Sequence, residues 1–187
     1  ILDDGFQDLK IKKNLNIICF NQKQLIGNGL TIPSGPLREN LSSLKKADVI
    51  VINGQQDKVF EEKILSYNKN LKIYYSQYKA TNILDFKEKK LLAFAGIGNP
   101  DNFFDLLYKN KLRVEKKLVF PDHYEFNKKD VLQILDDAKN NNLEIITTEK
   151  DYYRLKKYNI KQIAYLKIEL IIEEMEKLNR IILELND

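Results

Sequence analysis

Residues 91–107, LLAFAGIGNPDNFFDLL, pass from an apolar run through a Gly-x-Gly turn into a helical pattern. Pro100 suits the first turn of a helix, because its fixed φ is helical and the first-turn N–H needs no partner. The apolar residues between Phe103 and Leu107 then form one face of that helix. A strand that leads directly into a helix is the repeating unit of an α/β fold with a parallel sheet.

The same alternation extends in both directions from this stretch. We expect strands at 15–20, 48–53, 71–78, 91–96, 112–120, 143–148 and 162–168. Asn127 can cap a further helix, and a terminal helix is predicted from the apolar stripe Ile171, Met175, Leu178 and Ile182. The polar run at 87–90 marks the expected boundary between two units, residues 1–86 and 87–187.

Composition excludes several classes of protein. No apolar run approaches the ~20 residues that a membrane-spanning helix needs. The 31 basic and 27 acidic residues are interspersed, so we predict a solvated surface and no nucleic-acid partner. Cys19 is the single cysteine, which excludes an internal disulfide, and its apolar surroundings predict a core position.

An acidic loop lies at residues 3–7, Asp-Asp-Gly-Phe-Gln, after two apolar residues. Carboxylates that follow a parallel strand can hold Mg²⁺ beside phosphates, because this hard cation prefers oxygen ligands. We therefore expect a buried strand to end at Asp3. A simple Asp-Gly turn explains the tripeptide equally well.

A loop rich in glycine and proline runs from Gly27 through Pro36 to Arg38 and Glu39. Such residues fix backbone shape, which favours a structured loop. Arg38 is one of only four arginines, and its planar guanidinium could bind a phosphate through two hydrogen bonds. A structural turn with an Arg-Glu surface pair is the alternative.

Three further motifs follow predicted strands. The Gly96-x-Gly98 turn could hold an anion at a helix N-terminus, but Asp101 replaces the third glycine of a dinucleotide fingerprint, which argues against NAD. His123 is the only histidine, and its polar loop favours a functional role over a structural one, with the adjacent Asp122 available to fix its tautomer. Residues 147–151, Thr-Thr-Glu-Lys-Asp, read as a helix cap, with ligand contact by the lysine as the weaker interpretation.

Together and in this order, the motifs resemble those of the lipid A 4'-kinases over about residues 1–155. The resemblance rests on Asp-Asp-Gly-Phe-Gln at 3–7, Gly-Asn-Gly with Pro-x-Gly-Pro-Leu-Arg-Glu at 27–39, Ala-Asp-x-x-x-x-Asn at 47–53, Ala-Gly-Ile-Gly-Asn-Pro at 95–100, Asp-His at 122–123 and Thr-Glu-Lys-Asp at 148–151. It implies a P-loop parallel-sheet domain, of which residues 1–86 are the remainder, followed by a smaller α/β domain.

The resemblance also implies an activity. The family transfers the γ-phosphoryl group of ATP, with Mg²⁺, to the 4'-hydroxyl of tetraacyldisaccharide 1-phosphate, giving lipid IVA at the cytoplasmic face of the bacterial inner membrane. The lipid is implied to enter between the two domains, and contact with the membrane is peripheral. By resemblance Asp3 and Asp4 serve the metal and phosphates, Gln7 the cofactor, Arg38 and Glu39 the substrate. His123, with Asp4, is assigned to catalysis as support for the carboxylate base.

Two departures from the family pattern affect what we expect. Asp8 stands where the family commonly has a histidine, and none of the seven glycines begins a G-K-[ST] sequence, so no P-loop motif is present. The family's carboxylate base also lies upstream of Asp3. We therefore interpret the chain as a C-terminal piece of such a kinase, inactive alone. A noncatalytic α/β domain that binds phosphate or regulates another protein is the alternative.

Overall fold

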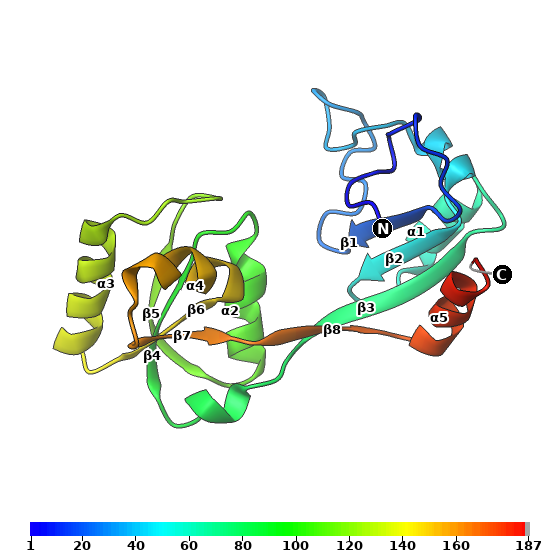
Figure 1. Ribbon diagram of the computed structural model, residues 1–187. Coiled ribbons are helices and arrows are strands. Elements are labelled where there is room, and N and C mark those ends of the chain that lie inside the picture. The colour runs from blue at the N-terminus through cyan, green and yellow to red at the C-terminus, as the bar shows by residue number, and fades with distance from the viewer. Residues whose placement is uncertain (186–187) are drawn as a thin grey trace. The chain divides into compact units, whose positions relative to one another are not determined.

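The computed structural model describes residues 1–185 and divides into two compact units (Figure 1). The first comprises Ile1–Gln77 and the segment from Leu170 onward, and the second is Tyr78–Glu169. This division differs from the predicted boundary between residues 86 and 87. The polar run at 87–90 lies inside the second unit, because Phe86 is 3% exposed and packs in that unit's core.

The first unit contains a four-stranded sheet with strand order β1-β2-β3-β8. Its elements are β1 (Ile17–Asn21), η1 (Leu41–Lys46), β2 (Val49–Asn53), α1 (Lys58–Leu65), β3 (Lys72–Ala80), β8 (Ile168–Ile172) and α5 (Met175–Leu183). β1, β2 and β3 are parallel, with Ile18 opposite Ile50 and Ile50 opposite Ile73.

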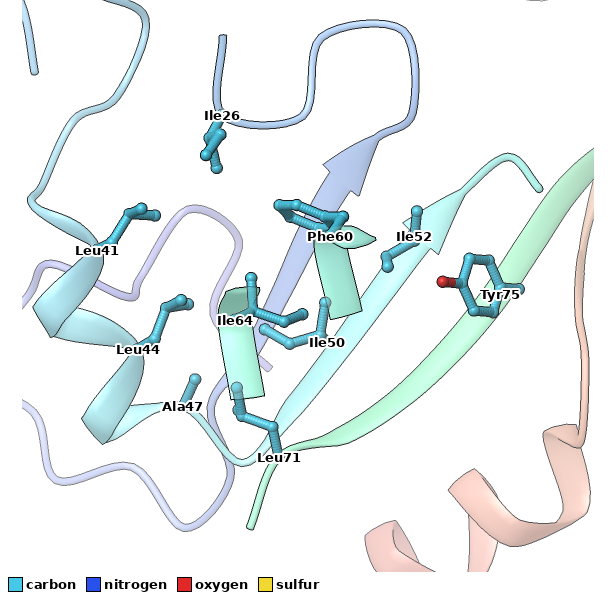
Figure 2. Close-up of a cluster of buried hydrophobic side chains, with 10 residues drawn as sticks. All are labelled: Ile26, Leu41, Leu44, Ala47, Ile50, Ile52, Phe60, Ile64, Leu71 and Tyr75. Atoms are coloured by element: carbon cyan, nitrogen blue, oxygen red, sulfur yellow. The ribbon is translucent and has the colours of Figure 1, made fainter. Parts of the chain in front are cut away.

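Both faces of β2 are buried, which explains its unbroken Val-Ile-Val-Ile sequence. Ile50 and Ile52 belong to the cluster in Figure 2, with side chains from η1 and α1. Val49 and Val51 belong to the other cluster, which includes Leu178 of α5. Each face is therefore covered by a helix, as parallel sheets require.

The end of the chain differs from the predicted helix, because Ile171 lies in β8 and the helix begins at Met175. The strand is favoured by the β-branched residues of Ile168–Ile172 and by their place beside β3, where the Glu173 N–H donates to the Tyr75 carbonyl at 2.8 Å. Within α5 only Leu178 is buried.

Two other expectations in the first unit were wrong. Ile1 and Leu2 form no strand and are exposed, since no strand among residues 1–185 pairs with them. Cys19 is exposed and not in the core, because β1 is an edge strand that pairs only with β2 in the described chain. Partial burial nevertheless raises the pKa of its thiol.

The second unit contains a parallel sheet with strand order β5-β4-β6-β7. Its elements are η2 (Ile83–Phe86), β4 (Lys90–Ala95), α2 (Pro100–Lys109), β5 (Arg113–Val119), α3 (Lys128–Asn140), β6 (Glu144–Thr148), α4 (Glu149–Leu155), η3 (Lys156–Tyr158) and β7 (Ile163–Leu166). The predicted helix starts are confirmed, with Pro100 in the first turn of α2 and Asn127 in a capping box with Asp130.

Helices cover opposite faces of this second sheet. Phe103, Phe104 and Leu107 of α2 pack in one cluster with alternate residues of β4, while α3 and α4 contribute to the cluster on the other face. The chain moves from β4 to β5 on one side and then to β6 on the other, so the strand order reverses between β4 and β6. The carboxyl ends of strands at such a switch point are the usual position of ligand sites in open α/β sheets.

None of the helices among residues 1–185 has the length and apolar character needed to cross a bilayer.

The stability of the first unit should fall at alkaline pH, because the Tyr75 hydroxyl then loses its proton. Burial, aided by a 2.7 Å hydrogen bond from its hydroxyl to Glu61 and opposed by the Asp57 N–H, raises its pKa from 10.0 to about 12. A raised pKa in the folded state gives stability that is full below pH 10 and is lost as the pH rises through 12. Tyr75→Phe should therefore flatten the decline in urea midpoint between pH 10 and 12.

Exposed Tyr108 supplies the control for this measurement. Tyr108→Phe should leave the alkaline decline as it is in the unsubstituted chain. An identical decline in the Tyr75→Phe protein would contradict the assignment to Tyr75.

Candidate functional site

The acidic loop at residues 3–7 precedes β1 and contains no helix or strand. The side chain of Lys13, which follows the loop in the sequence, holds its backbone in place. The Lys13 ammonium donates to the carbonyl oxygens of Gly5 at 2.8 Å, Phe6 at 3.2 Å and Asp8. Three carbonyls around one ammonium hold the backbone in a turn. The carboxylates of Asp3 and Asp4 are left exposed on this turn.

Arg38 contacts the acidic loop directly. Its Nη1 forms an ion pair with Oδ1 of Asp4, although 34 residues separate the two. Both side chains are more than half exposed, so the pair contributes little to stability, about 0–1 kcal/mol. Its significance is positional, because it brings together two predicted site residues from separate motifs.

An open depression of about 470 Å³ lies beside Arg38 and Glu39. Half of its lining residues carry hydroxyl or amide side chains, and Lys46 is a second cation beside Arg38. The lining residues are Thr31, Ile32, Arg38, Glu39, Asn40, Ser42, Ser43 and Lys46. Hydroxyl, amide and cationic groups suit a polar ligand that carries phosphate or sugar hydroxyls.

The oxygen donors in the acidic loop fit Mg²⁺. Asp3 and Asp4 are adjacent carboxylates, and the Oε1 atom of Gln7 is buried without a hydrogen-bond partner. Within residues 1–185 no cluster of three or more Asp, Glu, His or Cys side chains could hold a metal ion. Mg²⁺ commonly binds one or two carboxylates and completes its octahedron with phosphate and water, so a pair is enough.

His123 lies in the second unit, in the turn that follows β5. It has the left-handed φ of 57°, and 73% of its side chain is exposed. The Nδ1 atom lies 3.2 Å from Nη2 of Arg154, and Nε2 lies 3.5 Å from Nζ of Lys150. The imidazole thus faces two cations that belong to α4.

Asp122 does not hold the imidazole as predicted. Its Oδ1 accepts a 2.9 Å hydrogen bond from the His123 backbone N–H, while it is 4.0 Å from Nε2. That distance is too long for a hydrogen bond. The adjacent acid therefore fixes the turn, and a different residue must orient the ring.

Asp151 anchors this group of residues from inside the protein. It is fully buried, and its Oδ2 accepts from the Gly96 N–H at 2.8 Å and the Thr148 hydroxyl at 2.7 Å. Its Oδ1 pairs with Nη1 of Arg154 at 3.0 Å. There is little room for a side chain at Gly96, because a Cβ there would lie 3.3 Å from Asp151 Oδ1 and 3.4 Å from the Phe120 Cβ.

The two groups of predicted site residues lie in different units. Asp3, Asp4, Gln7, Arg38 and Glu39 belong to the first, and His123 to the second.

The Thr-Glu-Lys-Asp motif was predicted to be a helix cap. The cap is confirmed, since the Thr148 hydroxyl accepts a hydrogen bond from the Asp151 N–H at 3.1 Å.

Asp151 and Arg154 were missed as parts of a site. A signal was present, because Arg154 follows the motif and arginine is rare in this lysine-rich chain. What the sequence could not supply is the burial of Asp151.

Asp151→Asn should destabilise the second unit by about 2 kcal/mol, because the Arg154 guanidinium loses its charged partner while the Gly96 N–H keeps an acceptor. Chemical denaturation of the chain would measure this. Glu149→Gln, two residues earlier on the same helix and exposed, is the matched control and should change stability by less than about 0.5 kcal/mol. Equal effects in the two variants would contradict the anchoring role.

Comparison with known proteins gives one consistent result. The family model LpxK, tetraacyldisaccharide-1-P 4'-kinase, matches residues 1–187. Tetraacyldisaccharide 4'-kinases from Pelagibacter ubique and Rickettsia akari are 44% and 35% identical over 100% and 96% of this chain. The chain spans 60% and 54% of the lengths of those two relatives.

A solved structure has a similar fold. The crystal structure of LpxK from Aquifex aeolicus in complex with ATP matches with a TM-score of 0.69 at 24% identity. The match covers 97% of this chain and 55% of that one. The predicted α/β fold with parallel sheets is thereby confirmed.

Proposed function

Because the chain belongs to the tetraacyldisaccharide-1-P 4'-kinase family, we propose that it supplies the acidic loop, the Arg-Glu loop and the histidine of such a kinase. The reaction is transfer of the ATP γ-phosphoryl group to the 4'-hydroxyl of tetraacyldisaccharide 1-phosphate, which gives lipid IVA. The observation that carries the proposal is the ion pair between Asp4 and Arg38, which joins two of the motifs expected around the phosphates.

The residues divide the work according to their chemistry. Phosphoryl transfer depends on charge stabilisation and on removal of a proton from a poor sugar nucleophile. Asp3 and Asp4, with Gln7 beside them, hold Mg²⁺, which neutralises phosphate charge when bound with ATP. Arg38 and Glu39 bind the substrate, and His123 supports removal of the hydroxyl proton.

The lipid also determines where the kinase works. A tetraacylated substrate stays in a membrane, whereas ATP is cytoplasmic, so we place the reaction at the cytoplasmic face of the bacterial inner membrane. The contact with that membrane is peripheral. The depression beside Arg38, with Lys46 as its second cation, supports binding of anionic headgroups at this loop.

The test uses the complete kinase, with radiolabelled ATP and tetraacyldisaccharide 1-phosphate in detergent micelles. Transfer of label to the lipid is expected. Absence of transfer, with the enzyme shown to be folded and to bind ATP, would reject the proposed reaction.

Arg38→Ala should raise the KM for the lipid by roughly 10–100-fold, because a charge-assisted hydrogen bond to an anion contributes about 1.5–3 kcal/mol. Arg38→Lys should recover only part of the loss, since an ammonium cannot form two parallel hydrogen bonds. Arg113→Ala removes an exposed arginine that pairs with Glu115 in the second unit and is the control. An unchanged lipid KM in Arg38→Ala would remove the substrate role from this loop.

A further inference from the structure

Three side chains in the second unit form a continuous series of contacts from the core to the surface. Asp151 is fully buried, the Arg154 side chain is 23% exposed, and the His123 side chain is 73% exposed. Arg154 uses Nη1 for Asp151 and Nη2 for His123. The exposed imidazole is therefore connected to a fixed point inside the protein.

Arg154 itself has little freedom to move. Its Nη1 donates both to Asp151 Oδ1 at 3.0 Å and to the Gly96 carbonyl at 2.8 Å. The Gly96 N–H in turn donates to Oδ2 of the same aspartate at 2.8 Å. Because a guanidinium is planar, two fixed partners at one end set the direction of the nitrogen that faces the histidine.

The chemistry of this contact determines which imidazole nitrogen carries the proton. A guanidinium has N–H donors and no acceptor, so the histidine nitrogen that it contacts must accept. That nitrogen is Nδ1, at 3.2 Å from Nη2. A neutral imidazole has one acceptor nitrogen, so its proton must then lie on Nε2.

Other charged groups near the ring do not set this choice. Lys150 Nζ lies 3.5 Å from Nε2, at the limit of hydrogen bonding, on an exposed and flexible side chain. Asp122 Oδ1 lies 4.0 Å from Nε2 and is already bonded to the backbone. The short contact from the anchored Arg154 is the one that specifies a tautomer.

We propose that Arg154 is a positioning residue that holds neutral His123 as the Nε2–H tautomer, with Nε2 turned outward to donate its hydrogen bond. The importance of this for catalysis rests on the proposed kinase function, in which an outward N–H would orient the carboxylate that removes the hydroxyl proton. The tautomer itself is a property of this chain and can be measured without any activity.

Nitrogen-15 NMR of the 187-residue chain tests the proposal directly, because the chain has a single histidine. At about pH 8.5, well above the ordinary histidine pKa of about 6.5, long-range proton–nitrogen correlations distinguish the two tautomers. We expect a protonated Nε2 and an unprotonated Nδ1. A predominant Nδ1–H form, or an equal mixture, would overturn the proposal.

Variants identify the residue responsible. Arg154→Met removes the N–H donor that contacts Nδ1 of His123. Arg154→Lys also removes this contact but keeps a cation near Asp151, so it replaces the first variant if that protein does not fold. Each should shift the tautomer toward a mixture. Lys150→Met, which removes the exposed cation 3.5 Å from Nε2, should not. A shift in Lys150→Met with none in either Arg154 variant would contradict the assignment.

A kinetic measurement on the complete kinase separates this inference from the proposed function. Arg154→Lys should lower kcat by about tenfold or more and leave the KM for ATP unchanged, because only proton removal is affected. If NMR shows Nε2–H but neither Arg154 nor His123 affects turnover, the kinase role of the histidine fails and the positioning stands. If NMR shows Nδ1–H, the positioning fails whatever the turnover.

Discussion

His123→Asn should lower the kcat of the complete kinase by more than about 100-fold, because proton transfer by a positioned side chain typically contributes 10²–10⁴-fold. Asparagine is a better replacement than alanine for this test, because it suits the backbone conformation of residue 123. His123 has a left-handed φ of 57°, a conformation that asparagine tolerates and alanine does not. The loss in His123→Asn therefore reports on the imidazole alone, whereas His123→Ala also strains the turn.

The control for this substitution is another exposed residue with the same backbone conformation. Lys111 has φ of 57° and lies in the same unit, so Lys111→Asn introduces the same side chain on the same backbone conformation at a position outside the site. Its turnover should equal that of the unsubstituted enzyme. Normal turnover in His123→Asn would remove His123 from the mechanism.

The strands of the two sheets could be predicted because they are short apolar runs between helical patterns. β4 and β6, for example, begin and end within one residue of the expected ranges. Pro100 and Asn127 identified helix starts for the same reason, since their effects on the backbone are local.

The predictions that failed depend on contacts between distant parts of the chain. The boundary was placed in the polar run at 87–90, but β3 and β8 both continue through the division between the units. Ile171 fitted a helical stripe as well as it fitted a strand, and only the neighbouring β3 decides between them. Periodicity carries no information about the partner of an edge strand.

The candidate site could be proposed from residue types, whereas its contacts could not be predicted. The sequence contains three unusual features in loops, which are the Asp3-Asp4 motif, the Arg38 loop and His123. The pairing of Asp4 with Arg38 spans 34 residues and has no local signature. Asp151 looked like an ordinary first-turn acid, and its burial under the Gly96 turn appears only when β4 and β6 lie side by side.

Asp4→Asn should also lower kcat by more than about 100-fold, through loss of a charged oxygen ligand for Mg²⁺. Asparagine again fits the backbone, because Asp4 has a left-handed φ of 54°. It keeps the shape of the side chain and an oxygen for Arg38 while removing the charge. Asp8→Asn, at the exposed residue that directly follows the acidic loop, is the matched control and should leave turnover unchanged.

The dependence on Mg²⁺ concentration distinguishes the two functions that Asp4 could have. A metal ligand that loses its charge raises the Mg²⁺ concentration needed for half-maximal turnover, whereas a residue that only holds Arg38 raises the KM for the lipid. Arg38→Ala leaves the Asp4 carboxylate in place, so it should change the lipid KM and not the Mg²⁺ requirement. If Asp4→Asn and Arg38→Ala produced the same change in lipid KM and no change in Mg²⁺ requirement, the acid would serve the arginine and not the metal. We expect Asp4→Asn to change the Mg²⁺ requirement and Arg38→Ala to change the lipid KM. A surface ion pair with one arginine needs only one carboxylate, whereas this loop exposes two adjacent carboxylates.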